Sequence, residues 1–194
     1  MRQPWIAVTA LALTILITSP FHALAAEPAA AQTKPPAVEP AKIGEKLKVH
    51  LCGDKLCLAG QPSEDDIAQL KASGFRRVIS LRKEDEIDWD ESARLRDAQI
   101  EFIPVPFQTD AELTDEVFLR IRQLLTESDQ TPTVLHCGSA TRVAAVWLTH
   151  RVLDQKVDLD TALAEAKNIG LRSPALEAKA KDYIQRQQSG QKSP

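Results

Sequence analysis

The sequence lacks a long apolar run, a repeated unit and an excess of basic residues, and each absence excludes a class of protein. Its longest apolar stretch, residues 5–17, is shorter than the about 20 residues that a membrane-spanning helix needs. No repeat with a period of about 20 to 50 residues is visible, so a repeat architecture is not expected. The 24 lysines and arginines do not outnumber the 27 acidic residues, and no basic stripe appears. Nucleic acid is therefore not an expected partner.

The first 25 residues have the pattern of a secretory signal peptide. Arg2 precedes the apolar run, Ser19-Pro20 ends it, and Ala23-Leu24-Ala25 supplies the small residues of a cleavage site. The alternative is an uncleaved membrane anchor, but a lipoprotein is not expected because no cysteine lies near the cut. We therefore expect a periplasmic or secreted protein with no membrane span after cleavage.

The chain beyond this peptide divides into a linker, one domain and a short tail. Residues 26–46 are rich in alanine, proline, lysine and glutamate, a composition that predicts a disordered linker. Residues 47–188 are long enough for one compact domain with its own core. Residues 189–194 are expected to form a disordered tail.

The chain has only three cysteines: Cys52, Cys57 and Cys137. An odd number in an exported protein indicates one pair and one free thiol. The segment from Cys52 to Cys57 predicts a hairpin with a four-residue loop that places the two thiols opposite each other. We expect a Cys52–Cys57 disulfide, although two unpaired cysteines on opposite strands remain the alternative. A metal site is less favoured, because His50 is the only further ligand nearby.

Apolar segments of strand length alternate with segments of helical periodicity along the domain. Strands are expected at residues 75–81, 100–105 and 132–136. Helices are expected from Ser63 to Gly74 and over residues 89–98, 142–153, 159–168 and 175–187, with another beginning at Thr114. This alternation predicts an α/β fold with a mainly parallel central sheet flanked by helices.

The most informative segment is the cysteine loop, residues 136–142, which has the sequence HCGSATR. It follows an apolar strand and leads into a helix, so its backbone N–H groups and the helix N-terminus favour an anion. Arg142 can bind two oxygens of that anion, and the same positive field stabilises the thiolate of Cys137. We therefore expect Cys137 to be a nucleophile, Gly138, Ser139, Ala140 and Thr141 to bind substrate, and His136 to support the loop.

Three motifs together give the sequence a resemblance to a known family. The segments LAGQPS (residues 58–63) and GFRRVISLR (residues 74–82), followed by His136-Cys137, resemble the beta-lactamase-hydrolase-like phosphatase domains known as DUF442. These belong to the superfamily of cysteine-dependent protein tyrosine and dual-specificity phosphatases. The resemblance covers residues 49–153 and implies a dual-specificity-phosphatase-like fold. It also implies hydrolysis of phosphate monoesters through a cysteinyl-phosphate intermediate.

The spacing between Cys137 and Arg142 departs from the usual phosphatase pattern. Four residues separate them here, whereas ordinary cysteine phosphatases have five with a glycine in the middle. The shorter spacing is similar to that of rhodanese-type sulfurtransferases, which hold a persulfide on the cysteine. A third alternative is an inactive module that binds an anion or a partner, which a Cys137 buried away from solvent would favour. The expected substrate is thus a phosphorylated or a sulfur-bearing anion.

A phosphatase also needs an acid that protonates the leaving group. By resemblance this is an aspartate on the loop that follows the preceding strand, which here is Asp110, with Glu112 as a substitute. The acidic stretch over residues 84–91 is interpreted as a solvated surface. No metal or cofactor is expected, because Arg142 and the loop amides supply the positive field. The oligomeric state cannot be read from the sequence.

Overall fold

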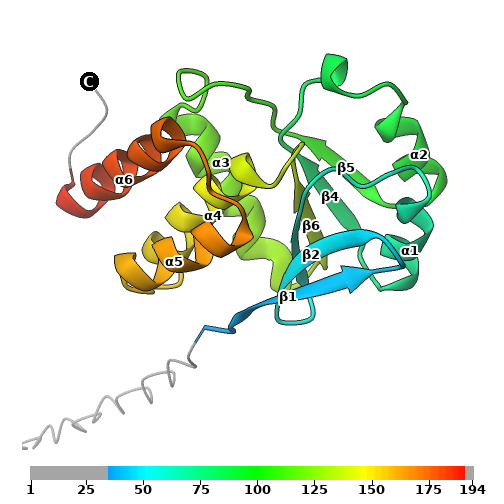
Figure 1. The fold of residues 1–194 in the computed structure, drawn as a ribbon, viewed down its shortest axis with the longest axis horizontal. Coiled ribbons are helices and arrows are strands. Elements are labelled where there is room, and N and C mark those ends of the chain that lie inside the picture. Colours follow the sequence, from blue (N-terminus) through cyan, green and yellow to red (C-terminus); the bar gives the residue numbers. More distant parts are fainter. Residues whose placement is uncertain (1–34, 191–194) are drawn as a thin grey trace, which may run out of the picture. The chain divides into compact units, whose positions relative to one another are not determined.

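The computed structural model describes residues 35–190, so the predicted signal peptide and the first part of the predicted linker lie outside the described residues. A six-stranded sheet has the order β1-β2-β3-β6-β4-β5 (Figure 1). Its strands are β1 (Val38–Ile43), β2 (Leu47–Cys52), β3 (Leu56–Ala59), β4 (Arg77–Ser80), β5 (Glu101–Pro104) and β6 (Thr133–His136). The helices are α1 (Asp66–Ala72), α2 (Glu91–Asp97), α3 (Asp115–Thr126), α4 (Thr141–Leu153), α5 (Leu159–Ile169) and α6 (Pro174–Ser189), with short 3₁₀ turns η1 (Glu84–Glu86) and η2 (Glu127–Asp129).

Helices cover both faces of this sheet, as the alternating pattern predicted. Helices α3 to α6 pack on one face of the sheet (Figure 1). The larger core cluster lies there and includes the fully buried Trp147 of α4. Helices α1 and α2 pack on the other face, over a smaller cluster that includes Leu70 and Leu95. Helix α4 is buried along nearly its whole length because α3, α5 and α6 all contact it. The predicted α/β fold with a mainly parallel sheet is confirmed.

The direction of the strands decides where a site can form. Strands β3, β6, β4 and β5 are neighbours in that order and run parallel. Their carboxyl ends therefore lie at one edge of the sheet, and the loops that follow them meet there. These loops are residues 60–65, 81–90, 105–114 and 137–140. The cysteine loop is one of the two central loops of this group, because β6 lies between β3 and β4.

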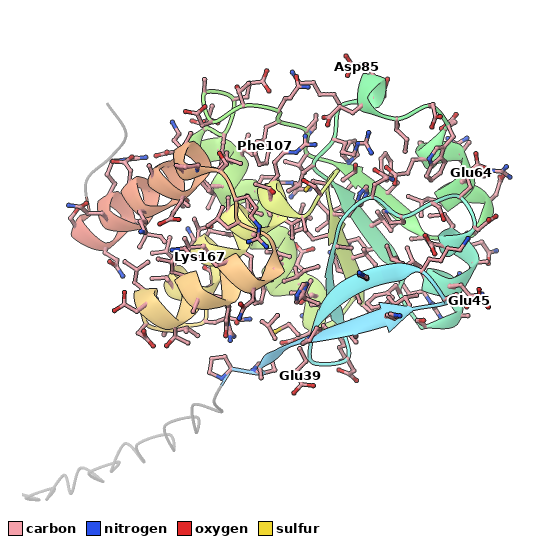
Figure 2. The ribbon with its side chains drawn as sticks, viewed as in Figure 1. Glu39, Glu45, Glu64, Asp85, Phe107 and Lys167 are labelled. Atoms are coloured by element: carbon pink, nitrogen blue, oxygen red, sulfur yellow. The ribbon has the colours of Figure 1, made fainter. Side chains whose placement is uncertain are left out.

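The predicted disordered linker is wrong in its second half. Residues 38–43 form β1, which pairs antiparallel with β2 along its full length, from Val38 opposite Cys52 to Ile43 opposite Leu47. Composition misled the prediction, because an edge strand tolerates proline where a central strand does not. Pro40 lies on this outer strand, and Glu39 beside it points outward (Figure 2). The folded part of the chain thus begins before residue 47.

The predicted disulfide is also wrong, because all three cysteines are free. The hairpin is present but its loop has three residues, and the register sets Cys52 opposite Leu56 and Cys57 opposite Leu51. Successive side chains of a strand point to opposite faces. Cys52 therefore packs in the cluster under α3 to α6, whereas Cys57 packs in the cluster under α1 and α2. The sheet itself separates the two thiols.

Local capping follows the sequence at most helix starts. Thr114 and Ser173 accept hydrogen bonds from the backbone N–H groups of Val117 and Leu176, as N-caps of α3 and α6. The helix expected from Ser63 begins later, at Asp66, because Ser63 lies in a preceding turn and donates to the Asp66 carboxylate from both its N–H and its hydroxyl. None of the helices within residues 35–190 has the length and apolarity that a membrane span requires.

Candidate active site

The cysteine loop lies at the carboxyl edge of the sheet because it directly follows strand β6. The strand is fully buried between β3 and β4, and Cys137 is the first residue after it. The chain then turns through Ala140, whose φ of 63° is left-handed, and enters α4 at Thr141. This conformation costs an alanine about 1 kcal/mol, which the surrounding contacts must offset. The loop is thus a tight reversal between a buried strand and a buried helix.

Two glycines let neighbouring loops approach the cysteine loop closely. A Cβ at Gly60 would lie 3.2 Å from the carbonyl oxygen of Gly138, and a Cβ at Gly170 would lie 3.4 Å from that of Ser139. The N–H of Gln61 donates to Gly138 O at 3.2 Å, and the Thr141 hydroxyl donates to Gly170 O at 2.9 Å. The loop is therefore fixed on both sides through its own carbonyls and a side-chain hydroxyl.

The amides of the loop remain available. Within the described residues, the N–H groups of residues 138–140 donate no hydrogen bond to another group of the chain. Gly138 and Ser139 are exposed, whereas Cys137 is buried, with 1% of its surface exposed. The N-terminus of α4, a helix of 13 residues, adds positive potential at the same place. The buried thiol is thus followed by an exposed segment whose amide donors are not used within residues 35–190.

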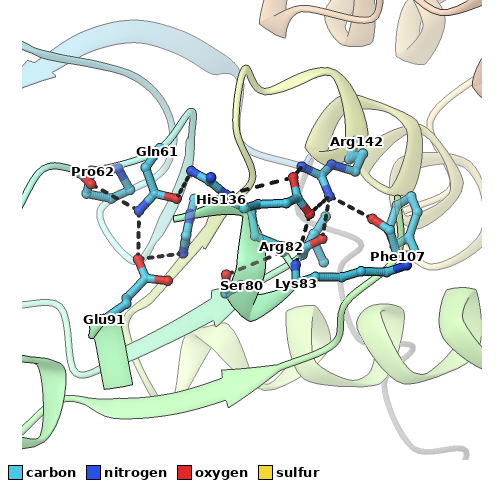
Figure 3. A network of polar contacts seen from close by, with 11 residues as sticks. Gln61, Pro62, Ser80, Arg82, Lys83, Glu91, Phe107, His136 and Arg142 are labelled. Atoms are coloured by element: carbon cyan, nitrogen blue, oxygen red, sulfur yellow. Dashed lines mark hydrogen bonds and ion pairs between the residues drawn. The ribbon is translucent and has the colours of Figure 1, made fainter. Parts of the chain in front are cut away.

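Arg142 connects the three loops that follow β4, β5 and β6. Its Nη1 donates to the carbonyl oxygens of Leu81 at 2.9 Å and Phe107 at 2.7 Å. The guanidinium also bonds both carboxylate oxygens of Glu86, at 2.8 Å and 2.5 Å (Figure 3). Burial alone would lower the pKa of Arg142, but the hydrogen bond to Glu86 and the charge of Cys137 raise it. The arginine is therefore a fixed cation beside the thiol.

Glu86 is held as a carboxylate by the same contact. The hydrogen bond from Arg142 is the main cause that lowers the pKa of Glu86 to about 2. Both side chains are largely buried, with 12% of Arg142 and 17% of Glu86 exposed, so the pair is only partly screened by water. Asp85, its neighbour on η1, instead points outward at the surface (Figure 2).

His136 has a buried acidic partner in Glu91. Its Nε2 lies 3.2 Å from the Glu91 carboxylate, and 0% and 6% of the two side chains are exposed. The two atoms are close, but the direction between them is not that of a good hydrogen bond. Burial alone would raise the pKa of Glu91, but the contacts with His136 and Gln61 lower it. His136 thus lies at the start of the cysteine loop, where the sequence predicted a supporting residue. Its partner, Glu91, was not predicted.

Asp110 and Glu112 both lie on the loop after β5, but their side chains differ in the contacts that they make. Asp110 is exposed and has no side-chain hydrogen bond or ion pair within residues 35–190. Glu112 is paired with Lys83 at 2.8 Å and accepts from the N–H of Gln108. The bond from Lys83 is the main cause that lowers the pKa of Glu112. Glu112 therefore stays ionised, which makes it a poor proton donor.

A cavity of about 360 Å³ opens beside these contacts, between η1, the start of α2 and the ends of β4 and β5. Arg82, Glu91 and Ser80 form part of its wall, and Trp89 and Phe102 supply aromatic surface. The residues of the cysteine loop do not line it. No group of three or more metal-binding side chains occurs within residues 35–190.

The interpretation of residues 84–91 as a solvated surface is wrong at two positions. Glu86 and Glu91 point inward to Arg142 and His136, whereas Glu84, Asp85 and Asp88 are exposed as expected or partly so. Sequence reasoning also missed a role for Gln61, although it stands within the LAGQPS motif on which the resemblance rests. No periodicity separates the inward from the outward carboxylates, because the segment between η1 and α2 is irregular.

Comparison with known proteins supports this geometry. A family model described as "DSP-PTPase phosphatase fused to NAD+ Kinase" (PTP-NADK) matches residues 37–187, nearly all of the described fold. No curated protein sequence matches the chain.

Several solved structures share the fold at low sequence identity. TpbA of P. aeruginosa is 22% identical, with a TM-score of 0.55 over 71% of this chain and 83% of its own. A DUF442 phosphatase from Shewanella putrefaciens CN-32 is 15% identical, with a TM-score of 0.61 over 75% of this chain and 91% of its own. PTPMT1 is 16% identical, with a TM-score of 0.58 over 73% of this chain and 97% of its own. The predicted dual-specificity-phosphatase-like fold is confirmed.

Proposed function

Because this chain belongs to the PTP-NADK family of dual-specificity-type phosphatase domains, we propose that it hydrolyses phosphate monoesters with Cys137 as nucleophile. One observation carries the proposal: the Cys137 thiol lies beside the fixed Arg142 cation, at the start of a loop whose next three N–H groups donate no hydrogen bond within residues 35–190. Free amide donors of such a loop can bind a tetrahedral dianion and stabilise the charge that develops in the transition state. One structure of TpbA, a protein with this fold, holds phosphotyrosine.

The reaction divides into two displacements. The thiolate of Cys137 forms a bond to phosphorus as the bond to the ester oxygen breaks, and the leaving alkoxide takes a proton from an acid. Water then attacks the cysteinyl phosphate, the sulfur–phosphorus bond breaks, and inorganic phosphate leaves as the same carboxylate accepts the proton of the water. Arg142 and the amides of residues 138–140 bind the phosphoryl oxygens in both steps.

Asp110 is the proposed acid. It lies on the loop after β5, whose Phe107 carbonyl accepts a hydrogen bond from Arg142. Its side chain makes no hydrogen bond or ion pair within residues 35–190, whereas Glu112 is held by Lys83 and by the N–H of Gln108. The free, exposed Asp110 can therefore move over a bound substrate and donate a proton, whereas Glu112 cannot do so without losing Lys83.

A paired assay on the same protein tests the proposal. We expect release of phosphate from an aryl phosphate that disappears in Cys137→Ser and falls about 100-fold in Asp110→Asn, with the Michaelis constant little changed. Asp97→Asn, at the exposed end of α2, is the matched control and should retain activity. Full activity of Asp110→Asn would show that Asp110 is not the acid, and it would leave the proposed role of Cys137 unchanged.

Sulfur transfer is the second candidate, because the four-residue spacing between Cys137 and Arg142 favours it. In that reaction Cys137 takes the outer sulfur of thiosulfate as a persulfide, sulfite leaves, and cyanide then removes the sulfur as thiocyanate. No acid is needed. Thiocyanate formed from thiosulfate, without phosphate release from the aryl ester and without any effect of Asp110→Asn, would replace the phosphatase proposal.

Burial of Cys137 is the observation that favours the third candidate, an inactive binding module. A thiol at the base of an exposed loop is also what an in-line attack on a bound anion requires, and Gly138 and Ser139 above it are exposed. Absence of both phosphate and thiocyanate formation, with phosphate still bound by the folded protein, would establish the module instead.

Export is a separate proposal. Residues 1–25 would direct the chain across the membrane and be removed after Ala25, leaving a periplasmic or secreted enzyme. Mass spectrometry of the N-terminus from fractionated cells tests it. A mature chain that begins at residue 26 supports export, and an intact Met1 in the cytoplasmic fraction contradicts it.

A further inference from the structure

The two ends of the cysteine loop are joined by a continuous series of side-chain contacts. We call this series the loop network: His136, Glu91, Gln61, Arg82, Glu86 and Arg142 (Figure 3). His136 begins the loop and Arg142 ends it, so the network links the two ends of the loop that contains Cys137. The four residues between these ends come from two loops of the carboxyl edge: Gln61 follows β3, whereas Arg82, Glu86 and Glu91 follow β4.

Gln61 is the central member of this network. Its amide nitrogen donates to Glu91 at 2.9 Å and to the Pro62 carbonyl at 3.0 Å. Its amide oxygen accepts from Nη1 of Arg82 at 2.7 Å. Its backbone N–H donates to Gly138 O at 3.2 Å, within the cysteine loop itself. One residue thus contacts the partner of His136, the loop backbone, and the arginine that leads to Glu86.

An amide is the group that fits between these two neighbours. Glu91 is an acceptor and the Arg82 guanidinium is a donor, so the residue between them must donate on one side and accept on the other. A carboxylate would repel Glu91, and an ammonium would repel Arg82. The Gln61 side chain satisfies both without a net charge in a largely buried place.

Packing alone does not hold Glu91 and Arg82 in position. Both side chains line the cavity beside α2, so one flank of each faces open space instead of other side chains. The Nε atom of Arg82 is buried without a hydrogen bond within the described residues, and its nearest carboxylate oxygen, of Glu86, is 3.9 Å away. His136 and the Ser80 hydroxyl also contact Glu91, but of these three partners only Gln61 also bonds the Arg82 side chain. Gln61 is therefore the residue that sets the positions of these two charges relative to each other.

We propose that Gln61 is a positioning residue that aligns His136 and Arg142 on either side of Cys137 by bridging Glu91 and Arg82. The proposal rests on the proposed function, because it concerns the same nucleophile. Gln61 acts through its neighbours, because within residues 35–190 its side chain bonds Glu91, Arg82 and Pro62 and not Cys137. Removing its amide frees Glu91 to leave His136 and frees Arg82 to pair with Glu86, in competition with Arg142.

Chemical modification of Cys137 measures this alignment without relying on phosphatase activity. Iodoacetate is an anion and reacts faster with a thiol that Arg142 faces, whereas neutral iodoacetamide does not benefit from the arginine. In both reactions the sulfur displaces iodide. The two rates are measured from the increase in mass of the peptide that contains Cys137. Their ratio reports how closely the Arg142 guanidinium is oriented towards the thiol.

The test compares Gln61→Leu with wild type and with Gln69→Leu, an exposed glutamine on α1 that carries the same change. We expect the iodoacetate-to-iodoacetamide ratio to fall about tenfold in Gln61→Leu and to stay at the wild-type value in Gln69→Leu. Turnover of an aryl phosphate should fall with it, mainly in kcat. A folded Gln61→Leu that keeps both the ratio and the turnover overturns the proposal.

These readouts separate the two proposals. A wild-type protein without phosphatase activity, whose ratio still falls in Gln61→Leu, refutes the proposed function and supports the positioning role. A wild-type phosphatase whose activity and ratio survive in Gln61→Leu refutes only the positioning role.

If Gln61→Leu does not fold, a second variant provides the test. Gln61→Glu keeps the acceptor for Arg82 but sets a carboxyl against Glu91, with His136 and Glu86 as the other titrating groups nearby. Two facing carboxyls share a proton, so their pKa is raised, and protonation restores a donor towards Glu91. We expect the defect in the rate ratio to shrink as the pH falls towards about 5. A ratio equal to wild type at all pH values overturns the proposal.

Discussion

Arg142 and Glu86 form a two-point pair in which each guanidinium nitrogen bonds a different carboxylate oxygen. The pair joins the first residues of α4 to the turn η1, which lies 56 positions earlier in the chain. A bidentate pair fixes the plane of the guanidinium as well as its position, which a single contact does not. The orientation of Arg142, the cation proposed to bind phosphate, is thus set by a residue outside the cysteine loop.

Replacement of Glu86 should therefore impair the reaction more than the fold. Glu86→Gln keeps the shape but loses the charge, and we expect kcat/KM for an aryl phosphate to fall about tenfold as Arg142 loses its orientation. Steady-state kinetics measures it, with Asp85→Asn on the outer side of η1 as the control. Equal activity of the two variants would contradict the role of the pair.

The buried ion pair at the end of α4 should make the protein sensitive to acid. Asp154 accepts two hydrogen bonds from Arg122, at 2.8 Å and 2.6 Å, and lies 3.0 Å from Nδ1 of His150. Burial would raise its pKa, but these partners lower it from 3.8 to about 2. A lowered carboxyl pKa stabilises the fold above the unfolded value, and this stabilisation is lost as the pH falls from 3.8 to about 2.

Replacement of Asp154 should cause, at neutral pH, part of the loss of folding stability that acid causes in the wild-type protein. We expect Asp154→Asn to lower the free energy of unfolding by about 2 kcal/mol, because Arg122 loses its carboxylate while largely buried. Urea unfolding at neutral pH measures the loss. Asp160→Asn on the exposed side of α5 is the control and should change stability by less than about 0.5 kcal/mol.

The two cysteines of the hairpin should remain thiols under oxidising conditions. Cys52 and Cys57 lie on opposite faces of the sheet, so a bond between them would require β2 or β3 to turn over. Mass spectrometry after alkylation in denaturant, without a reducing agent, should find three modified cysteines. A linked peptide containing both residues would contradict the register of the hairpin.

Strand β1 should contribute to stability although its composition is that of a linker. A chain that begins at residue 47 loses the partner of β2 and the buried side chain of Ile43. Compared with a chain that begins at residue 35, we expect its free energy of unfolding to be lower by about 2 kcal/mol or more. Thermal and urea unfolding of the two chains would show the difference, and equal stability would restore the linker interpretation.

The parts of the fold that the sequence predicted correctly have local signals. Thr114 precedes a helical pattern and caps α3, and the apolar segment before Cys137 forms β6 between two parallel neighbours. The position of Arg142 at the start of α4 follows from the same local pattern. Each of these features depends on residues within a few positions of one another, so pattern and spacing were sufficient.

The features that were missed depend on contacts between distant segments. Pro40 reads as a linker residue until β2 is known to lie beside it, and the faces of Cys52 and Cys57 depend on one position of register. Glu86 and Glu91 stand among exposed acids of the same composition, and only the location of Arg142 and His136 distinguishes them. Partner-dependent roles of this kind are not visible in a single sequence.

The parallel order of β3, β6, β4 and β5 has a consequence for how such a protein can diversify. Each loop at the carboxyl edge leaves a different strand, and the strands hold one another in place through the sheet. Residues 108–112, the exposed part of the loop after β5, could change without shifting β6 or Cys137, whereas Phe107, which accepts from Arg142, could not. The proposed nucleophile and the exposed tip of this loop thus lie on different strands and can vary separately.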